Sequence, residues 1–155
     1  MAEQCFCKAK VPGSNPGGGS MDVIEELKKL NFPSEKYVVF GGAALAARGL
    51  RETFDIDIVA SDDLLAKCGA EGWKEHPRLK SGEKNGFHKG IIEIYPNVGG
   101  NFEANFADLR KNAEMIDGIP FCGLNDVIRI KRAYGRAKDL KDIELIENYL
   151  SNSKK

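Results

Sequence analysis

This chain of 155 residues lacks excess charge, long apolar runs and any signal-peptide segment. Its 23 lysines and arginines balance its 23 aspartates and glutamates, so no overall field favours nucleic acid or an anionic membrane. The apolar runs are far too short to span a bilayer, and the N-terminus has no hydrophobic core of the signal-peptide kind. We therefore expect a cytoplasmic protein with one modest core and no membrane partner.

Cysteine and histidine are too sparse to form a metal site of their own. The four cysteines are Cys5, Cys7, Cys68 and Cys122. They lack the paired spacing of zinc sites and any secretory context, which indicates reduced thiols. His76 and His88 are too few and too far apart in the sequence to act as a metal pair. The sequence also contains no internal repeat.

Residues 1–20 differ in composition from the rest of the chain. The stretch "KVPGSNPGGGS" is rich in Gly, Pro and Ser without apolar periodicity, which predicts disorder. Its Gly-Ser-Asn-Pro run resembles a translated tRNA-gene T-arm, so one hypothesis is that the native protein starts at Met21. An expression linker is the alternative. In both cases we expect an extension over residues 1–20 and a single domain over residues 21–155.

Hydrophobic spacing predicts alternating helices and strands from Met21 onward. Strands are predicted in "KYVVF", "TFDIDIVA" and "GIIEIYP", with strand fragments around residues 73–90 and a small strand near residues 119–122. Helices are predicted in "MDVIEELKKLNF", ended by Pro33, in "AALAARG", in "SDDLLAKCGAEG", and in two C-terminal segments over residues 124–150 that Gly135 separates. This order predicts an α/β (α+β) fold, with a small mixed β-sheet flanked by helices and a C-terminal helical pair.

Two aspartates stand one residue apart in the second strand. Alternation places Asp55 and Asp57 on one face and Phe54, Ile56 and Ile58 on the other. Residues two apart are separated by about 6–7 Å along a strand, and two carboxylates so placed repel unless a cation or donors lie between them. Mg²⁺ prefers a few carboxylates plus phosphate oxygens. The pair therefore predicts a metal site, and the alternative is a solvated strand with an acidic outer face.

Gly41 and Gly42 end the first of these strands, just before a predicted helix. Glycine lets the backbone approach a ligand closely, and the free N–H groups of a helix start favour phosphate. Taken alone, the pair indicates no more than a tight turn. Together with two carboxylates on a neighbouring strand, it predicts one site for phosphate and metal.

The string "GGAALAARGLRETFDID" resembles the signature of the polymerase-β-like nucleotidyltransferase superfamily. It is most similar to a small prokaryotic branch that includes lincosamide-type and abortive-infection-toxin-type nucleotidyltransferases. The tail "LNDVIRIKRAYGRAKDLKDIELI" is similar to the same branch. The resemblance spans about Tyr37 to Leu150, and it implies the minimal fold of that superfamily.

The resemblance implies an enzyme that transfers NMP from an NTP to a hydroxyl acceptor with Mg²⁺. It assigns catalysis and metal binding to three carboxylates, Asp55, Asp57 and Glu93. It assigns nucleotide binding to Gly41, Gly42, Arg51, Thr53 and Lys131. The third carboxylate would also act as general base. Glu93 is the preferred candidate for it because it sits mid-strand between apolar neighbours, and Glu103 and Asp108 are the alternatives.

In the tail, four charged residues are interpreted as ion pairs that lock the two helices, namely Arg136, Lys138, Asp139 and Asp142. Lys131 is expected to combine packing with phosphate contact. Ala43 and Ala44 stand where many members of the superfamily have a serine, so a hydroxyl to the phosphate is missing. The tail offers only two helices, so the acceptor site is expected to be small, shared with a second subunit, or lost.

The acceptor stays open between a small molecule, a tRNA and a protein side chain. A cognate partner protein or a homodimer is a further expectation. The alternative function is a non-catalytic nucleotidyltransferase-like binding module, for example one half of a toxin–antitoxin pair. A dinucleotide-binding domain is disfavoured because the Gly-x-Gly-x-x-Gly spacing is absent. Trp73 and the phenylalanines are assigned to the core and not to base stacking.

Overall fold

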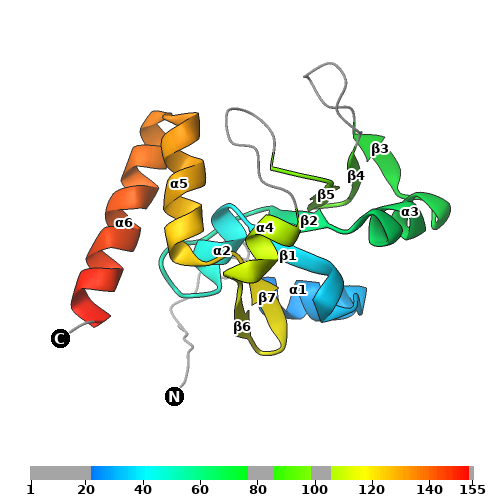
Figure 1. The fold of residues 1–155 in the computed structure, drawn as a ribbon, viewed down its shortest axis with the longest axis horizontal. Coiled ribbons are helices and arrows are strands. Elements are labelled where there is room, and N and C mark those ends of the chain that lie inside the picture. The colour runs from blue at the N-terminus through cyan, green and yellow to red at the C-terminus, as the bar shows by residue number, and fades with distance from the viewer. Residues whose placement is uncertain (1–21, 77–85, 99–105, 154–155) are drawn as a thin grey trace.

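The computed structural model describes residues 22–76, 86–98 and 106–153 (Figure 1). The strands are β1 (Tyr37–Phe40), β2 (Ile56–Ala60), β3 (Lys74–His76), β4 (Gly86–Lys89), β5 (Ile92–Tyr95), β6 (Glu114–Ile116) and β7 (Ile119–Phe121). The helices are α1 (Val23–Leu30), α2 (Gly42–Ala46), α3 (Asp62–Ala70), α4 (Phe106–Lys111), α5 (Leu124–Tyr134) and α6 (Ala137–Ser153), with a 3₁₀ turn η1 (Ser34–Lys36). The predicted N-terminal extension and Glu103 lie outside the described residues.

The strands form a single mixed sheet in the order β3-β4-β5-β2-β1-β7-β6. The pairs β2–β5 and β1–β7 are parallel, and β1–β2, β3–β4, β4–β5 and β6–β7 are antiparallel. The predicted fold class is therefore confirmed: a mixed sheet with helices and a C-terminal helical pair. Among the described helices, none is both long and apolar enough to cross a membrane.

The centre of the sheet is buried on both faces. All four residues of β1 are buried, and so are four of the five residues of β2. A β-branched run of this kind suits a strand with no solvent-facing side. Asp57 interrupts the run as the half-buried member of β2. Asp57 is therefore the one charged residue in the two central strands β1 and β2.

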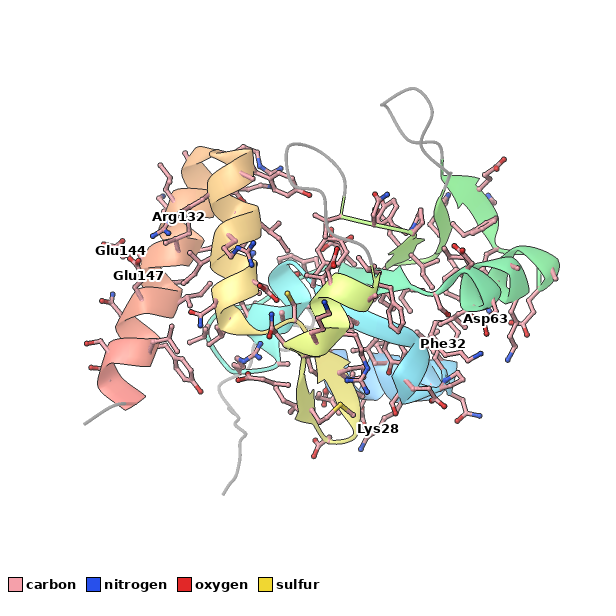
Figure 2. All side chains as sticks on the ribbon, in the orientation of Figure 1. Lys28, Phe32, Asp63, Arg132, Glu144 and Glu147 are labelled. Atoms are coloured by element: carbon pink, nitrogen blue, oxygen red, sulfur yellow. The ribbon has the colours of Figure 1, made fainter. Side chains whose placement is uncertain are left out.

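The helices α5 and α6 pack side by side at one end of the molecule, whereas α3 and β3 lie at the opposite end (Figure 1). Gly135 separates α5 from α6 in the left-handed region, with φ 66°, as predicted. On the outside of the pair, Arg132 lies 3.4 Å from Glu147 (Figure 2). Apolar side chains on the inner side, such as Val127, Ile143 and Ile146, join the core.

The helix α1 ends before the residue predicted to end it. The side chain of Asp22 caps its start by accepting a hydrogen bond from the Glu25 N–H at 3.2 Å. Asn31 then adopts the left-handed conformation, with φ 55°, and closes the helix after Leu30. Pro33 instead precedes the 3₁₀ turn.

The strand β2 is shorter than predicted, and the predicted burial of Phe54 is wrong. Residues before Ile56 are not part of the strand, and Phe54 is 70% exposed. The Thr53 hydroxyl donates to the Asp55 carbonyl at 3.2 Å, a local bond that competes with strand pairing. The chain bends at Phe54, and the strand begins only at Ile56.

The β6–β7 hairpin was not predicted as a unit, since the sequence interpretation placed only one small strand there. Asp117 and Gly118 have φ values of 52° and 80°. Two consecutive residues in the left-handed region form the tight turn that matches the twist of a two-stranded hairpin. The dipeptide Asp-Gly between "EMI" and "IPF" was the signal that would have revealed it.

Candidate functional site

The structure brings together two of the three predicted carboxylates across neighbouring strands. Asp57 of β2 and Glu93 of β5 are direct register partners in a parallel pair. Partners in register place their side chains on the same face of a sheet. Asp55 is exposed and lies immediately before β2. Asp108, the alternative to Glu93, lies on α4 and not on a strand.

The environment of Asp57 opposes its negative charge. Burial raises the pKa of Asp57, and the charges of Asp55 and Glu93 raise it further, against a lowering by Lys131 and Lys138, so that it reaches about 7. The carboxyl is therefore short of positive charge or hydrogen-bond donors. An uncompensated carboxyl in the centre of a sheet is typical of a functional site.

Glu93 has a local partner that the sequence interpretation missed. The Tyr95 hydroxyl donates a hydrogen bond to Glu93 Oε1. Both residues belong to β5, two positions apart, and so they face the same side of the sheet. The spacing Glu-x-Tyr within "IEIY" was the available signal. Tyr95 therefore orients the carboxyl that faces Asp57.

Gly41 lies directly against Asp57. Its backbone has φ 70° and ψ −149°, a region that is essentially restricted to glycine. A Cβ at this position would lie 3.1 Å from Asp57 Oδ2. The absent side chain thus leaves space beside the carboxylate for a ligand or for the carboxylate itself. Of the two predicted glycines, Gly41 is the one that faces the carboxylates.

Gly42 makes room for other side chains of the protein. A Cβ there would lie 2.8 Å from Thr53 Oγ1 and 3.0 Å from Arg51 Nη2. Thr53 is only 4% exposed, and its hydroxyl is engaged with the Asp55 carbonyl. The structure therefore joins three of the predicted nucleotide-binding residues in one packed turn that supports Asp55.

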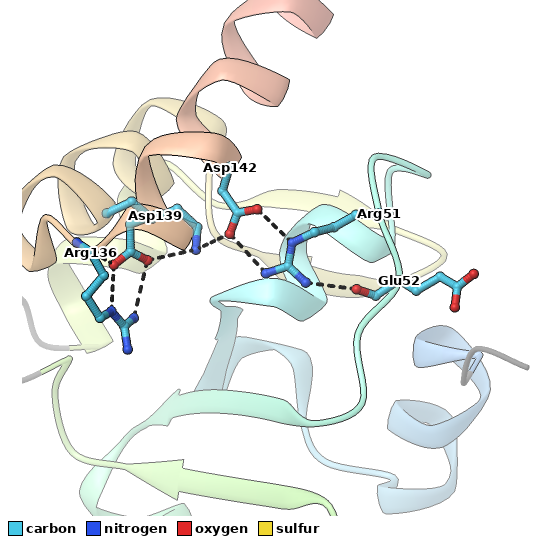
Figure 3. A network of polar contacts seen from close by, with 6 residues as sticks. Arg51, Glu52, Arg136, Asp139 and Asp142 are labelled. Atoms are coloured by element: carbon cyan, nitrogen blue, oxygen red, sulfur yellow. Dashed lines mark hydrogen bonds and ion pairs between the residues drawn. The ribbon is translucent and has the colours of Figure 1, made fainter. Parts of the chain in front are cut away.

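Arg51 is held by the C-terminal helices (Figure 3). Its Nε lies 2.8 Å from Asp142 Oδ1 and its Nη2 lies 3.0 Å from Asp142 Oδ2, a bidentate pair. Its Nη1 donates to the Glu52 carbonyl at 2.8 Å. All three guanidinium nitrogens are used within the protein, which ties the turn before β2 to α6.

Lys131 belongs to the same network. It is buried on α5, with Nζ 2.8 Å from Asp142 Oδ2 and 3.5 Å from Asp139 Oδ1. Arg136 completes the network through its Nε, 2.6 Å from Asp139 Oδ2. We call these five residues the helix clamp: Arg51, Lys131, Arg136, Asp139 and Asp142.

The sequence interpretation expected ion pairs among four residues of this tail. Arg136, Asp139 and Asp142 form them, as predicted. Lys138 does not: it is exposed, and among the described residues it forms no hydrogen bond or ion pair. Arg51 was not expected in the network, because nothing in the sequence links it to Asp142, which lies 91 positions away.

The donor set around Asp57 fits Mg²⁺. Among the described residues, no three His, Cys, Asp or Glu side chains converge closely enough to surround one ion. Mg²⁺ does not require this, because it is bound through one or two carboxylates and completes its shell with waters and substrate phosphates. Asp57 and Glu93 supply such a pair, with Asp55 close enough to act on Asp57. The shortage of positive charge at Asp57 is what a cation would relieve.

The comparison with solved structures bears on the fold. No family model matches the chain, and no curated protein matches it. A similar solved structure is the crystal structure of "a putative nucleotidyltransferase (TM1012)" from Thermotoga maritima, with a TM-score of 0.50, 21% identity, and coverage of 86% of this chain and 97% of that chain. At this identity the likeness shows the fold alone: this chain has a nucleotidyltransferase-like fold.

Proposed function

We propose that this chain is a nucleotidyltransferase that transfers NMP from an NTP to a hydroxyl acceptor and releases pyrophosphate. The observation that carries the proposal is the register pair Asp57–Glu93, with Gly41 directly against Asp57. Burial and two neighbouring carboxylates oppose the charge of Asp57, so a bound cation is the best physical explanation of this arrangement. The nucleotidyltransferase-like fold supports the same conclusion.

In the proposed reaction, the acceptor oxygen attacks the α-phosphorus of the NTP. A new phosphorus–oxygen bond forms, the bond to the β-phosphate oxygen breaks, and pyrophosphate leaves with that electron pair. The acceptor proton passes to a carboxylate, for which Glu93 is the candidate, because the Tyr95 hydroxyl holds it in place. Asp55 and Asp57 would share the Mg²⁺ ligation with Glu93.

Bound Mg²⁺ would neutralise charge on the phosphates and on the carboxylates. The protein's own contribution is position. Gly41 keeps the space beside Asp57 clear. The packed turn at Gly42 positions Asp55, because the Thr53 hydroxyl donates to the Asp55 carbonyl. The helix clamp fixes the same turn through the bond from Arg51 to Asp142. Preorganisation of this kind is a main source of rate in phosphoryl transfer.

The proposal is tested by thermal shift and by labelling. Mg²⁺ with an NTP is expected to raise the melting temperature of the parent by mass action. Asp57→Asn is expected to lose that rise. Asp117→Asn, which also removes one carboxylate but lies in the β6–β7 turn, is expected to keep it. If Asp57→Asn keeps the full Mg²⁺–NTP shift, the carboxylate pair is not the nucleotide site.

The acceptor is identified with α-labelled NTPs incubated with the protein and fractionated lysate. Label in small molecules, in tRNA or in protein distinguishes the three acceptor classes. A cognate partner protein or a second copy of the chain is tested by repeating the assay over a range of protein concentrations.

A non-catalytic module is the second candidate, including one half of a toxin–antitoxin pair. The observation that favours it is the helix clamp, which engages Arg51 and Lys131 within the protein. Such a module would show the Mg²⁺–NTP thermal shift but would transfer no label to any fraction. Transfer that Asp57→Asn abolishes would exclude it.

A further inference from the structure

The cations near Asp57 differ in whether they already form an ion pair with a carboxylate of the protein. Arg51 and Lys131 share the carboxylate of Asp142, with three contacts between 2.8 and 3.0 Å. Arg136 is paired with Asp139. A cation paired with a buried carboxylate must give up that pair in order to bind a phosphate, and breaking such a pair is strongly unfavourable. The predicted phosphate contact of Lys131 therefore carries a large penalty.

Lys138 is a cation in this region that has no such partner among the described residues. It lies in the first turn of α6, between Arg136 and Asp139 of the helix clamp. Asp139 is fully buried and Lys138 is exposed. Clamp residues on both sides of Lys138 fix the backbone at that position, and its long side chain stays available to solvent. Asp142, one helical turn after Lys138, binds Arg51 in the turn before β2, so the start of α6 lies beside the strand that carries Asp57. In agreement with this placement, the charge of Lys138 lowers the pKa of Asp57.

We propose that Lys138, and not Lys131 or Arg51, is the cation that contacts the phosphates of the nucleotide at the Asp57–Glu93 site. The inference rests on the proposed function and corrects the part assigned to Lys138, which the sequence interpretation placed among the structural ion pairs. The site then has a simple division of labour. The helix clamp positions the start of α6, and Lys138 presents an unpaired ammonium group to the ligand.

The test compares Lys138→Gln with Lys141→Gln by calorimetric binding of Mg·ATP and of inorganic tripolyphosphate with Mg²⁺. Lys141 is a matched control because it is an exposed lysine on the same helix, three positions away. Loss of a charged contact is expected to weaken both ligands about tenfold to a hundredfold in Lys138→Gln. Lys141→Gln is expected to bind both as the parent does, and Lys138→Arg is expected to recover most of the affinity.

The outcomes separate this inference from the proposed function. A parent that binds neither Mg·ATP nor tripolyphosphate overturns the proposed function. A parent that binds both, with unchanged affinity in Lys138→Gln, overturns only the role of Lys138. Equal weakening in Lys138→Gln and Lys141→Gln overturns it as well, because it shows a general field effect. Melting temperatures of both variants close to that of the parent are expected, since both side chains are exposed.

Discussion

At the scale of single residues, the carboxyl of Asp57 is opposed by burial and by two neighbouring carboxylates, which raise its pKa to about 7. The unfolded chain has the ordinary value of 3.8. Between these two values the folded protein binds a proton that the unfolded chain has released, so this group makes stability fall as pH rises from about 4 to 7. At about 1.4 kcal/mol per pH unit, the effect amounts to a few kcal/mol.

We therefore expect Asp57→Asn to remove this dependence. Its melting temperature without Mg²⁺ should equal or exceed that of the parent at pH 8, with a smaller difference at pH 5. Asp117→Asn is the control, because asparagine also tolerates the left-handed turn position. Unfolding of Asp57→Asn at pH 8 would mean that hydrogen-bond donors stabilise the charged carboxylate in the parent, and that it is not destabilising.

Gly42 gives a second prediction at this scale. An alanine Cβ would lie 2.8 Å from Thr53 Oγ1 and 3.0 Å from Arg51 Nη2, so a buried side chain must move. We expect Gly42→Ala to lower the free energy of unfolding in urea by about 1–3 kcal/mol. Because the clash is with the hydroxyl, the loss should be smaller when Gly42→Ala is made in a Thr53→Ala background. Purely additive losses would place the strain elsewhere.

The residues of the site were predictable to different degrees. Asp57 and Glu93 were identified because each interrupts an apolar strand, a local pattern that survives in the fold. Arg51 and Lys131 were chosen as nucleotide ligands, whereas the structure ties both to Asp142. No local pattern reveals a bond between residues so far apart in the chain. The exposure of Phe54 depended on one hydroxyl-to-carbonyl bond, which alternation alone does not reveal.

At the scale of elements, the helix clamp joins α5 and α6 to the turn before β2. Asp142→Asn would leave two cations without their shared carboxylate. We expect a loss of roughly 3 kcal/mol in urea unfolding, near the lower end for buried pairs, because the Arg51 side chain is 34% exposed. Arg132→Gln breaks a pair that is 63% and 55% exposed, and it should cost less than about 1 kcal/mol. Equal losses in the two variants would contradict the clamp.

The helices and central strands were predictable because the spacing of apolar residues that indicates them lies within each segment. The boundaries that failed were set by single residues. Asn31 ended α1 ahead of Pro33 by taking the left-handed conformation. The β6–β7 hairpin depended on the turn at Asp117 and Gly118. The strands β1 and β2, in contrast, pair with β7 and β5 from later in the chain, so their register could not follow from segment periodicity.

At the scale of the whole molecule, the order β3-β4-β5-β2-β1-β7-β6 is the feature least accessible from the sequence. It places β5 beside β2 and β7 beside β1, although other elements separate each pair along the chain. The first of these pairings creates the site, because it sets Glu93 opposite Asp57. The sequence predicted both residues on strands, and only the long-range pairing made them neighbours.

The two groups of titrating carboxyls have opposite effects on the stability of the molecule. Burial disfavours the charged forms of Asp139 and Asp142, but hydrogen bonds from Arg136, Arg51 and Lys131 outweigh it and lower both pKa values. The stability from the helix clamp is therefore present above about pH 4 and is lost as pH falls below the ordinary value of 3.8. The pKa of Asp57 is raised instead, so its contribution to stability increases as pH falls. Acid therefore stabilises the centre of the sheet and destabilises the helix clamp.

We therefore expect acid unfolding to begin at α5 and α6. Trp73 is the single tryptophan; it is 8% exposed, between α3 and β3, at the end of the molecule opposite to the helical pair (Figure 1). Far-UV circular dichroism is sensitive to α6, the longest described helix with 17 residues. As the pH falls below 4, the loss of dichroism should precede the change in tryptophan fluorescence. Asp142→Asn should move the dichroism transition to higher pH and should move the fluorescence transition less. Coincident transitions in the parent would show that the clamp and the sheet unfold as one cooperative unit.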